Sequence, residues 1–64
     1  MSNYLRLHFT GITAEQSEIL IAELSESGYE GFEEGPDELK AYIAAENWDE
    51  SSINEIAGRV GAPW

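Results

Sequence analysis

Few side chains in this 64-residue chain could carry out chemistry, and their spacing does not bring them together. Nucleophilic catalysis needs a nucleophile, a base and an orienting group within reach of one another. The chain has one histidine, His8, and no cysteine. His8 lies in a segment of strand-like alternation, which is typical of a half-exposed sheet residue. We therefore expect no catalytic residue in this chain.

Carboxylates are abundant, but their positions do not indicate a metal site. Glu33-Glu34 and Asp37-Glu38 flank a predicted turn, and the Asp-x-Asp-x-Asp-Gly pattern of a calcium loop is absent. Gly58 and Gly61 match the short Gly-x-x-Gly pattern of a KH loop, although ending a helix explains Gly61 equally well. No dinucleotide or P-loop fingerprint is present. We expect neither a metal nor a cofactor site.

The charge balance points to the kind of partner. Three Lys and Arg residues against thirteen Asp and Glu residues give a net charge of −10. This charge opposes binding to nucleic acid and to anionic membranes, and it favours a basic partner. The alternative is that acidity only keeps a small domain soluble. The lack of cysteine fits a reducing compartment, so we expect a cytoplasmic protein.

Alternation with period two predicts a strand over residues 4–10, with Leu5, Leu7 and Phe9 on its inner face. Thr13 and Gln16 form a capping-box pattern that begins a helix over residues 14–27. One stripe of this helix is predicted to face the core, and Ile19 is an apolar residue on its acidic outer side. The inward stripe comprises Ser17, Leu20, Ile21 and Leu24.

Two further strands, over residues 29–34 and 39–44, are predicted to form a hairpin through Pro36 and Asp37. Phe32 is the expected core residue of the first of these strands. Asp49 is the expected N-cap of a second helix, with Trp48 and Ile53 placed as a hydrophobic staple. The apolar stripe of that helix comprises Ile53, Ile56, Ala57 and Val60.

Both helices must share one apolar face of the sheet. We therefore predict an α+β two-layer sandwich of the ferredoxin-like order β-α-β-β-α, with strand order 1-3-2 and the last strand missing or displaced. The free edge of the strand at residues 4–10 would then invite self-association. The opposite sheet face would be open, and it would carry Tyr4, Arg6, His8, Lys40 and Tyr42.

That open face and Ile19 are the two candidate partner-binding surfaces. Aromatic residues on a sheet of this topology stack bases in RRM domains, so an RNA-binding role is one alternative. Without a basic surround, phosphate would be repelled, which disfavours it. A freestanding regulatory or adaptor module is the other alternative.

Three segments also match a known family in order and spacing: residues 4–7 (YLRL), 23–32 (ELSESGYEGF) and 39–43 (LKAYI). In these segments the chain resembles the N-terminal domain of the ribosomal protein L-eleven methyltransferases. The resemblance implies that residues 1–64 form the non-catalytic substrate-recognition domain of a larger enzyme. It also implies a basic ribosomal protein as substrate, and a separate Rossmann-like catalytic domain that binds S-adenosylmethionine. No cofactor-binding or catalytic residue is carried over to this chain.

Overall fold

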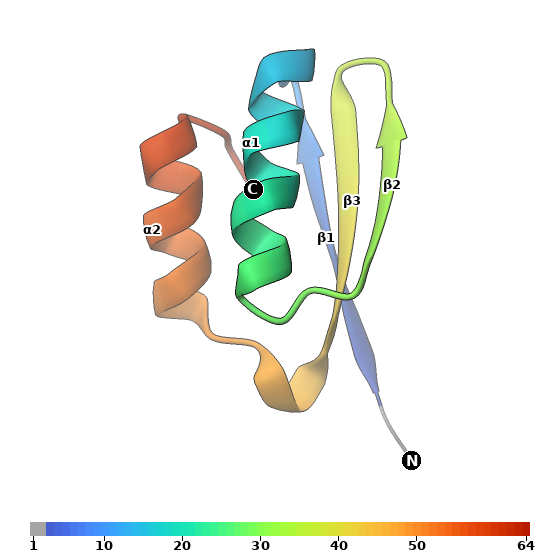
Figure 1. The fold of residues 1–64 in the computed structure, drawn as a ribbon, viewed down its shortest axis with the longest axis vertical. Helices are drawn as coiled ribbons and strands as arrows, with labels where there is room; N and C mark the ends of the chain where they lie inside the picture. The colour runs from blue at the N-terminus through green and yellow to red at the C-terminus, as the bar shows by residue number, and fades with distance from the viewer. Residues whose placement is uncertain (1–2) are drawn as a thin grey trace.

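The computed structural model describes residues 3–64 as three strands, two α-helices and one short 3-10 turn. The order along the chain is β-α-β-β-α, as the sequence predicts (Figure 1). The elements are β1 (Tyr4–Thr10), α1 (Ala14–Glu26), β2 (Gly31–Gly35), β3 (Glu38–Ala44), η1 (Ala45–Asn47) and α2 (Glu50–Val60).

The three strands form one antiparallel sheet in the order β1-β3-β2, which confirms the predicted order. Every residue of β1 pairs with β3, from Tyr4 opposite Ala44 to Thr10 opposite Glu38. β2 pairs with the other side of β3 over its whole length. The β2-β3 turn places Asp37 in the left-handed backbone region, with φ of 65°. Asp tolerates that region better than most residues, so the residue types predicted for the turn fit its geometry.

Both helices lie on one side of the sheet. α1 packs on the sheet, whereas α2 packs mainly on α1 and lies beyond the β1 edge (Figure 1). Local signals explain where both helices begin. The Thr13 hydroxyl accepts from Gln16 N at 3.1 Å, the Gln16 side chain accepts from Thr13 N at 2.9 Å, and Asp49 caps α2 through Ser51 N at 3.1 Å.

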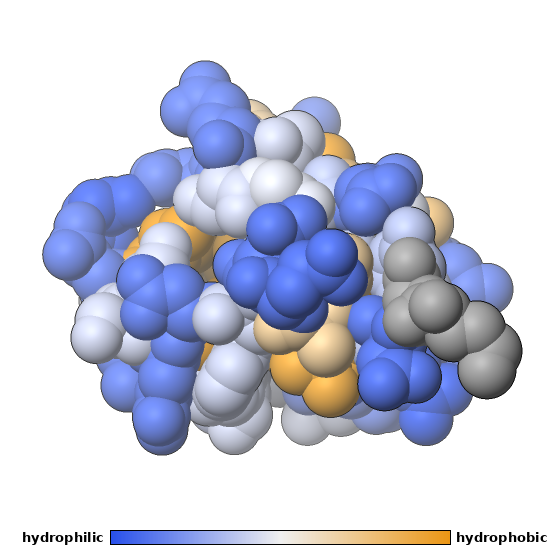
Figure 2. Space-filling view, turned by 90° about the horizontal axis from the view of Figure 1, so that it is seen from below, coloured by the Kyte–Doolittle hydropathy of each residue, from blue (hydrophilic) through white to orange (hydrophobic). Residues whose placement is uncertain are grey.

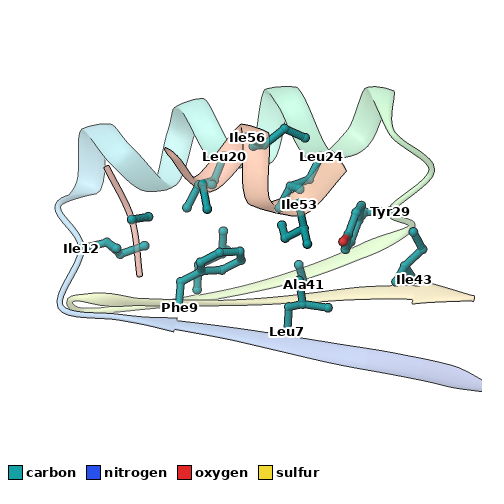
Figure 3. Close-up of a cluster of buried hydrophobic side chains, with 13 residues drawn as sticks. Leu7, Phe9, Ile12, Leu20, Leu24, Tyr29, Ala41, Ile43, Ile53 and Ile56 are labelled. Carbon is teal, nitrogen blue, oxygen red and sulfur yellow. The ribbon is translucent and has the colours of Figure 1, made fainter. Parts of the chain in front are cut away.

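The hydrophobic core lies between the helices and the sheet (Figure 3). Leu7 and Phe9 from β1 meet Leu20 and Leu24 from α1, and Ile53 of α2 closes the cluster. Trp48 and Phe32 are partly buried and pack against its border, so Phe32 contributes to the edge of the core rather than to its centre. Other buried members of the core are Ile12, Tyr29, Leu39, Ala41, Ile43, Ile56, Ala57 and Ala62.

Three sequence expectations need correction. Leu5 is on the predicted side of the sheet but is 38% exposed, because it lies near the start of β1, where the helices give little cover. Tyr29 is not part of β2, which begins at Gly31; it is a core residue in the connection after α1. Helix α1 ends at Glu26, one residue earlier than predicted, and Ser27 is its C-cap.

Seen from the end where β1 begins, the surface is mostly hydrophilic, with small apolar areas between the polar side chains (Figure 2). Within residues 3–64, neither helix combines the length and the apolar character needed to cross a membrane.

Candidate protein-interaction site

The open face of the sheet carries a set of polar and aromatic side chains on paired strands. The register places Arg6 directly opposite Tyr42 and His8 directly opposite Lys40. On the other side of β3, Glu33 is opposite Lys40. Side chains at directly opposed positions share a face of the sheet. The structure therefore brings Arg6, His8, Lys40 and Tyr42 together, as the sequence analysis predicts.

Carboxylates engage both tyrosines of this face. The Tyr4 hydroxyl donates to the Glu30 carboxylate at 3.2 and 3.3 Å, and the Tyr42 hydroxyl donates to Glu33. His8 Nε2 lies 2.6 Å from Glu38 Oε1. The sequence analysis missed these partners, because Glu30 and Glu38 come from a loop and a strand end. The face is thus a network of polar contacts rather than a bare aromatic platform.

These contacts raise the pKa of both tyrosine hydroxyl groups. The negative charge of Glu30 raises the pKa of Tyr4, and the hydrogen bonds to the same carboxylate raise it further. The hydrogen bond to Glu33 raises the pKa of Tyr42, while the nearby Arg6 guanidinium opposes part of that rise. Both tyrosines therefore remain neutral hydrogen-bond donors at physiological pH.

Charge is distributed unevenly over the molecule. The open face holds two of the three Lys and Arg residues, whereas Glu30, Glu33, Glu38 and Glu46 are the acidic residues that lie close to its side chains. The third cation, Arg59 on α2, bonds to Glu55 at 3.1 Å and to Glu23 of α1. The helices, the loops and the β2-β3 turn therefore carry nearly all of the negative charge.

Ile19 lies on this acidic side of the molecule. It is 45% exposed on α1, as predicted from its place on the outer side of the helix. A nearby groove of about 420 Å³ runs between the end of α1 and the start of α2. Its lining is mostly polar and acidic: Glu23, Glu26, Ser27, Asp49, Ser51, Ser52, Glu55, Ile56 and Arg59. Within the described residues, no group of carboxylate and imidazole side chains has an arrangement that could hold a metal ion.

The structure also reveals an aromatic pair that the sequence analysis did not foresee. The rings of Trp48 and Trp64 meet edge to face, with centroids 6.4 Å apart, and Trp64 Nε1 donates to Asn54 Oδ1 at 3.2 Å.

Burial raises the pKa of Tyr29, and the neighbouring Trp48 indole opposes part of this rise. The buried Trp48 Nε1 nonetheless forms no hydrogen bond of ordinary geometry with the described chain. Only the fold brings the Trp48 and Trp64 rings together, since α2 separates these two residues in sequence.

Comparisons with protein families, with curated proteins and with solved structures found no match to this chain. The candidate site is therefore interpreted from its own geometry and charge.

Proposed function

We propose that this chain is a protein-recognition domain that binds a basic partner through its acidic helical side. The observation that carries the proposal is the uneven charge distribution: the helices, loops and turn bear most of the acidic side chains, with exposed Ile19 among them. Opposite charge accelerates encounter over long range, while a desolvated apolar contact sets the lifetime of a complex.

The resemblance of residues 4–7, 23–32 and 39–43 supports a narrower role. On that basis the chain is the N-terminal substrate-recognition domain of a ribosomal-protein methyltransferase that uses S-adenosylmethionine. A basic ribosomal protein suits a domain with a net charge of −10. The methyl transfer itself then takes place on the separate catalytic domain. The open sheet face, with Tyr4 and Tyr42, is the second candidate contact surface.

An RNA-binding role is less favoured. The RRM-like interpretation depends on exposed rings beside a basic surface. Here Glu30 and Glu33 stand at the hydroxyls of Tyr4 and Tyr42, and carboxylates at these positions repel phosphate. A freestanding adaptor remains the second candidate function, because the same acidic helical side would serve it.

The experiment is a calorimetric titration of this chain with purified ribosomal protein L-eleven at low and at physiological salt. We expect weak binding that decreases as salt increases, because charge pairs at a surface are screened. Replacing a central apolar contact costs roughly 1 kcal/mol or more of binding free energy, so Ile19→Ala should weaken binding several-fold.

Tyr42→Ala is the matched variant on the opposite face. If Tyr42→Ala weakens binding and Ile19→Ala does not, the open sheet face is the contact surface and the helical assignment is wrong. A second titration uses a different basic protein of similar charge as a control. Tighter binding of L-eleven than of this control favours the methyltransferase domain, whereas equal binding of the two proteins favours the freestanding adaptor. Absence of binding at low salt would overturn the recognition role.

A further inference from the structure

The outer side of β1 is a free sheet edge with regularly spaced backbone groups. The Asn3 carbonyl accepts from Ala45 N at 2.8 Å, so Asn3 directs its backbone toward β3. In an antiparallel ladder this direction alternates along the strand. Leu5, Leu7 and Phe9 therefore also bond toward β3. The N–H and C=O groups of four residues point away from the sheet: Tyr4, Arg6, His8 and Thr10.

The opposite edge, on β2, is a poorer template. β2 has five residues, begins and ends with glycine, and carries the like charges Glu33 and Glu34. Short, charged strands are a common protection against edge pairing. β1 has seven residues, and its ladder with β3 runs without a bulge. An added strand would thus pair with β1 rather than with β2.

The position of α2 determines what can pair there. α2 lies on the outer side of β1, packed against α1 (Figure 1). Neighbouring strands are about 4.8 Å apart, whereas packed helices need roughly 8–10 Å between their axes. A second copy that added its own β1 to the sheet would bring its α1 into the space that α2 fills. On this argument a single extended segment is the favoured occupant of the edge, and symmetric self-association stays a prediction that the experiment below also tests.

The charge along this edge indicates the chemistry of that segment. Arg6 lies on β1, and among the described residues neither Arg6 nor Lys40 forms a salt bridge, although the chain has thirteen acidic residues. The Arg6 guanidinium lies near the Tyr42 hydroxyl and lowers its pKa. A carboxylate on a strand paired with β1 would be the cross-strand neighbour of Arg6. On the other face, half-exposed Leu5 favours an apolar neighbour.

We propose that the β1 edge binds one extended segment of a partner polypeptide by strand addition. That segment carries a carboxylate on the face of Arg6 and apolar side chains on the face of Leu5. Backbone hydrogen bonds to Tyr4, Arg6 and His8 provide its affinity, and the alternating side chains provide its specificity. The last residues of the chain return from the end of α2 toward α1 (Figure 1), with Trp64 against Trp48, and the backbone hydrogen bonds of the described residues include none between them and β1. This edge is distinct from the acidic helical side, so either proposal can fail without the other.

The experiment uses two synthetic peptides that alternate valine with threonine and differ at one central polar position, which is glutamate or lysine. Amide hydrogen exchange of the 64-residue chain is measured with each peptide at about 0.15 M salt, where the Debye length of roughly 8 Å screens the overall charge. We expect the glutamate peptide to slow exchange at Tyr4, Arg6 and His8 at least tenfold. The outward amides of Phe32 and Glu34 on β2 should not change.

Two controls separate strand addition from other modes of binding. A glutamate peptide with N-methylated edge-facing amides keeps its charge but loses its donors, and it should not slow exchange. Arg6→Gln should abolish the preference for glutamate over lysine, whereas Arg59→Gln should retain it. Unchanged exchange with the glutamate peptide would overturn the proposal, as would equal protection by the N-methylated peptide. Protection that rises with protein concentration alone would show instead that a second copy occupies the edge.

Discussion

Gln16 Nε2 donates a hydrogen bond to the backbone carbonyl of Val60 at 3.2 Å, and this bond joins the first turn of α1 to the last turn of α2. The same side chain accepts a hydrogen bond from Thr13 N through its oxygen. One amide group thus completes the cap of α1 and satisfies a carbonyl at the end of α2, which has no partner within its own helix. An ionised carboxylate could accept from Thr13 N but could not donate to the Val60 carbonyl.

Replacing Gln16 should therefore cost more than the loss of a cap alone. We expect Thr13→Ala to lower the free energy of unfolding by about 1 kcal/mol, the usual cost of losing an N-cap side chain. Gln16→Glu keeps the acceptor for Thr13 N but cannot donate to the Val60 carbonyl, so it should lower the free energy of unfolding. This loss is expected even though an acidic residue in the first turn normally stabilises a helix. Urea unfolding of the variants measures both effects. A Gln16→Glu protein as stable as the wild type would show that the bond between the helices contributes nothing.

Two isoleucines should respond very differently to the same truncation. Ile53 is 1% exposed within the core, whereas Ile19 is 45% exposed on α1. Ile53→Ala should cost roughly 2–5 kcal/mol of unfolding free energy, because it removes buried methyl groups and leaves a cavity. Ile19→Ala should change stability by no more than about 0.5 kcal/mol, as is usual at surface positions. Chemical denaturation tests the pair, and similar costs at both sites would contradict the packing described.

Two glycines should respond to alanine with opposite signs. Gly28 follows α1 with φ of 97°, a backbone conformation that alanine rarely adopts, although its surroundings leave room for a methyl group. Gly58 lies within α2, and apart from its chain neighbours and the backbone of its own helix nothing lies within 4 Å of an added Cβ. Gly28→Ala should destabilise the fold by about 1 kcal/mol or more, and Gly58→Ala should stabilise it by a similar amount. Thermal unfolding of the two variants distinguishes backbone strain from crowding.

Alkaline pH should weaken the fold through Tyr29. Burial raises the pKa of its hydroxyl above the ordinary value of 10.0, so the folded state holds this proton more tightly than the unfolded state. The contribution of this pKa difference to the free energy of unfolding is fully present below pH 10.0, and it is lost as the pH rises through the folded-state pKa of Tyr29. Tyr29→Phe has no such proton, and its unfolding free energy should fall less steeply above that pH. Parallel pH profiles of wild type and variant would contradict this assignment.

Several features of this protein follow from the sequence by itself, because they depend on neighbours a few residues apart. The capping box of Thr13 and Gln16, the Asp49 cap, the Pro36-Asp37 turn and the alternation of β1 all appear where short-range patterns predict them. The strand order 1-3-2 also followed, because it is the order that the ferredoxin-like arrangement gives to a β-α-β-β-α chain. The alternation of side chains along the strands also predicts one polar cluster on the open face, which comprises Arg6, His8, Lys40 and Tyr42.

Tertiary structure alone decided the features that depend on where elements meet. Leu5 has the inward orientation that alternation predicts, yet it is half exposed because the helices give that end of β1 little cover. The contacts of Tyr4 with Glu30 and of His8 with Glu38 join residues 26 and 30 positions apart, a separation at which composition and periodicity contain no signal. The position of α2 on the outer side of β1 likewise results from packing on α1, and that packing determines which partner the edge can accept.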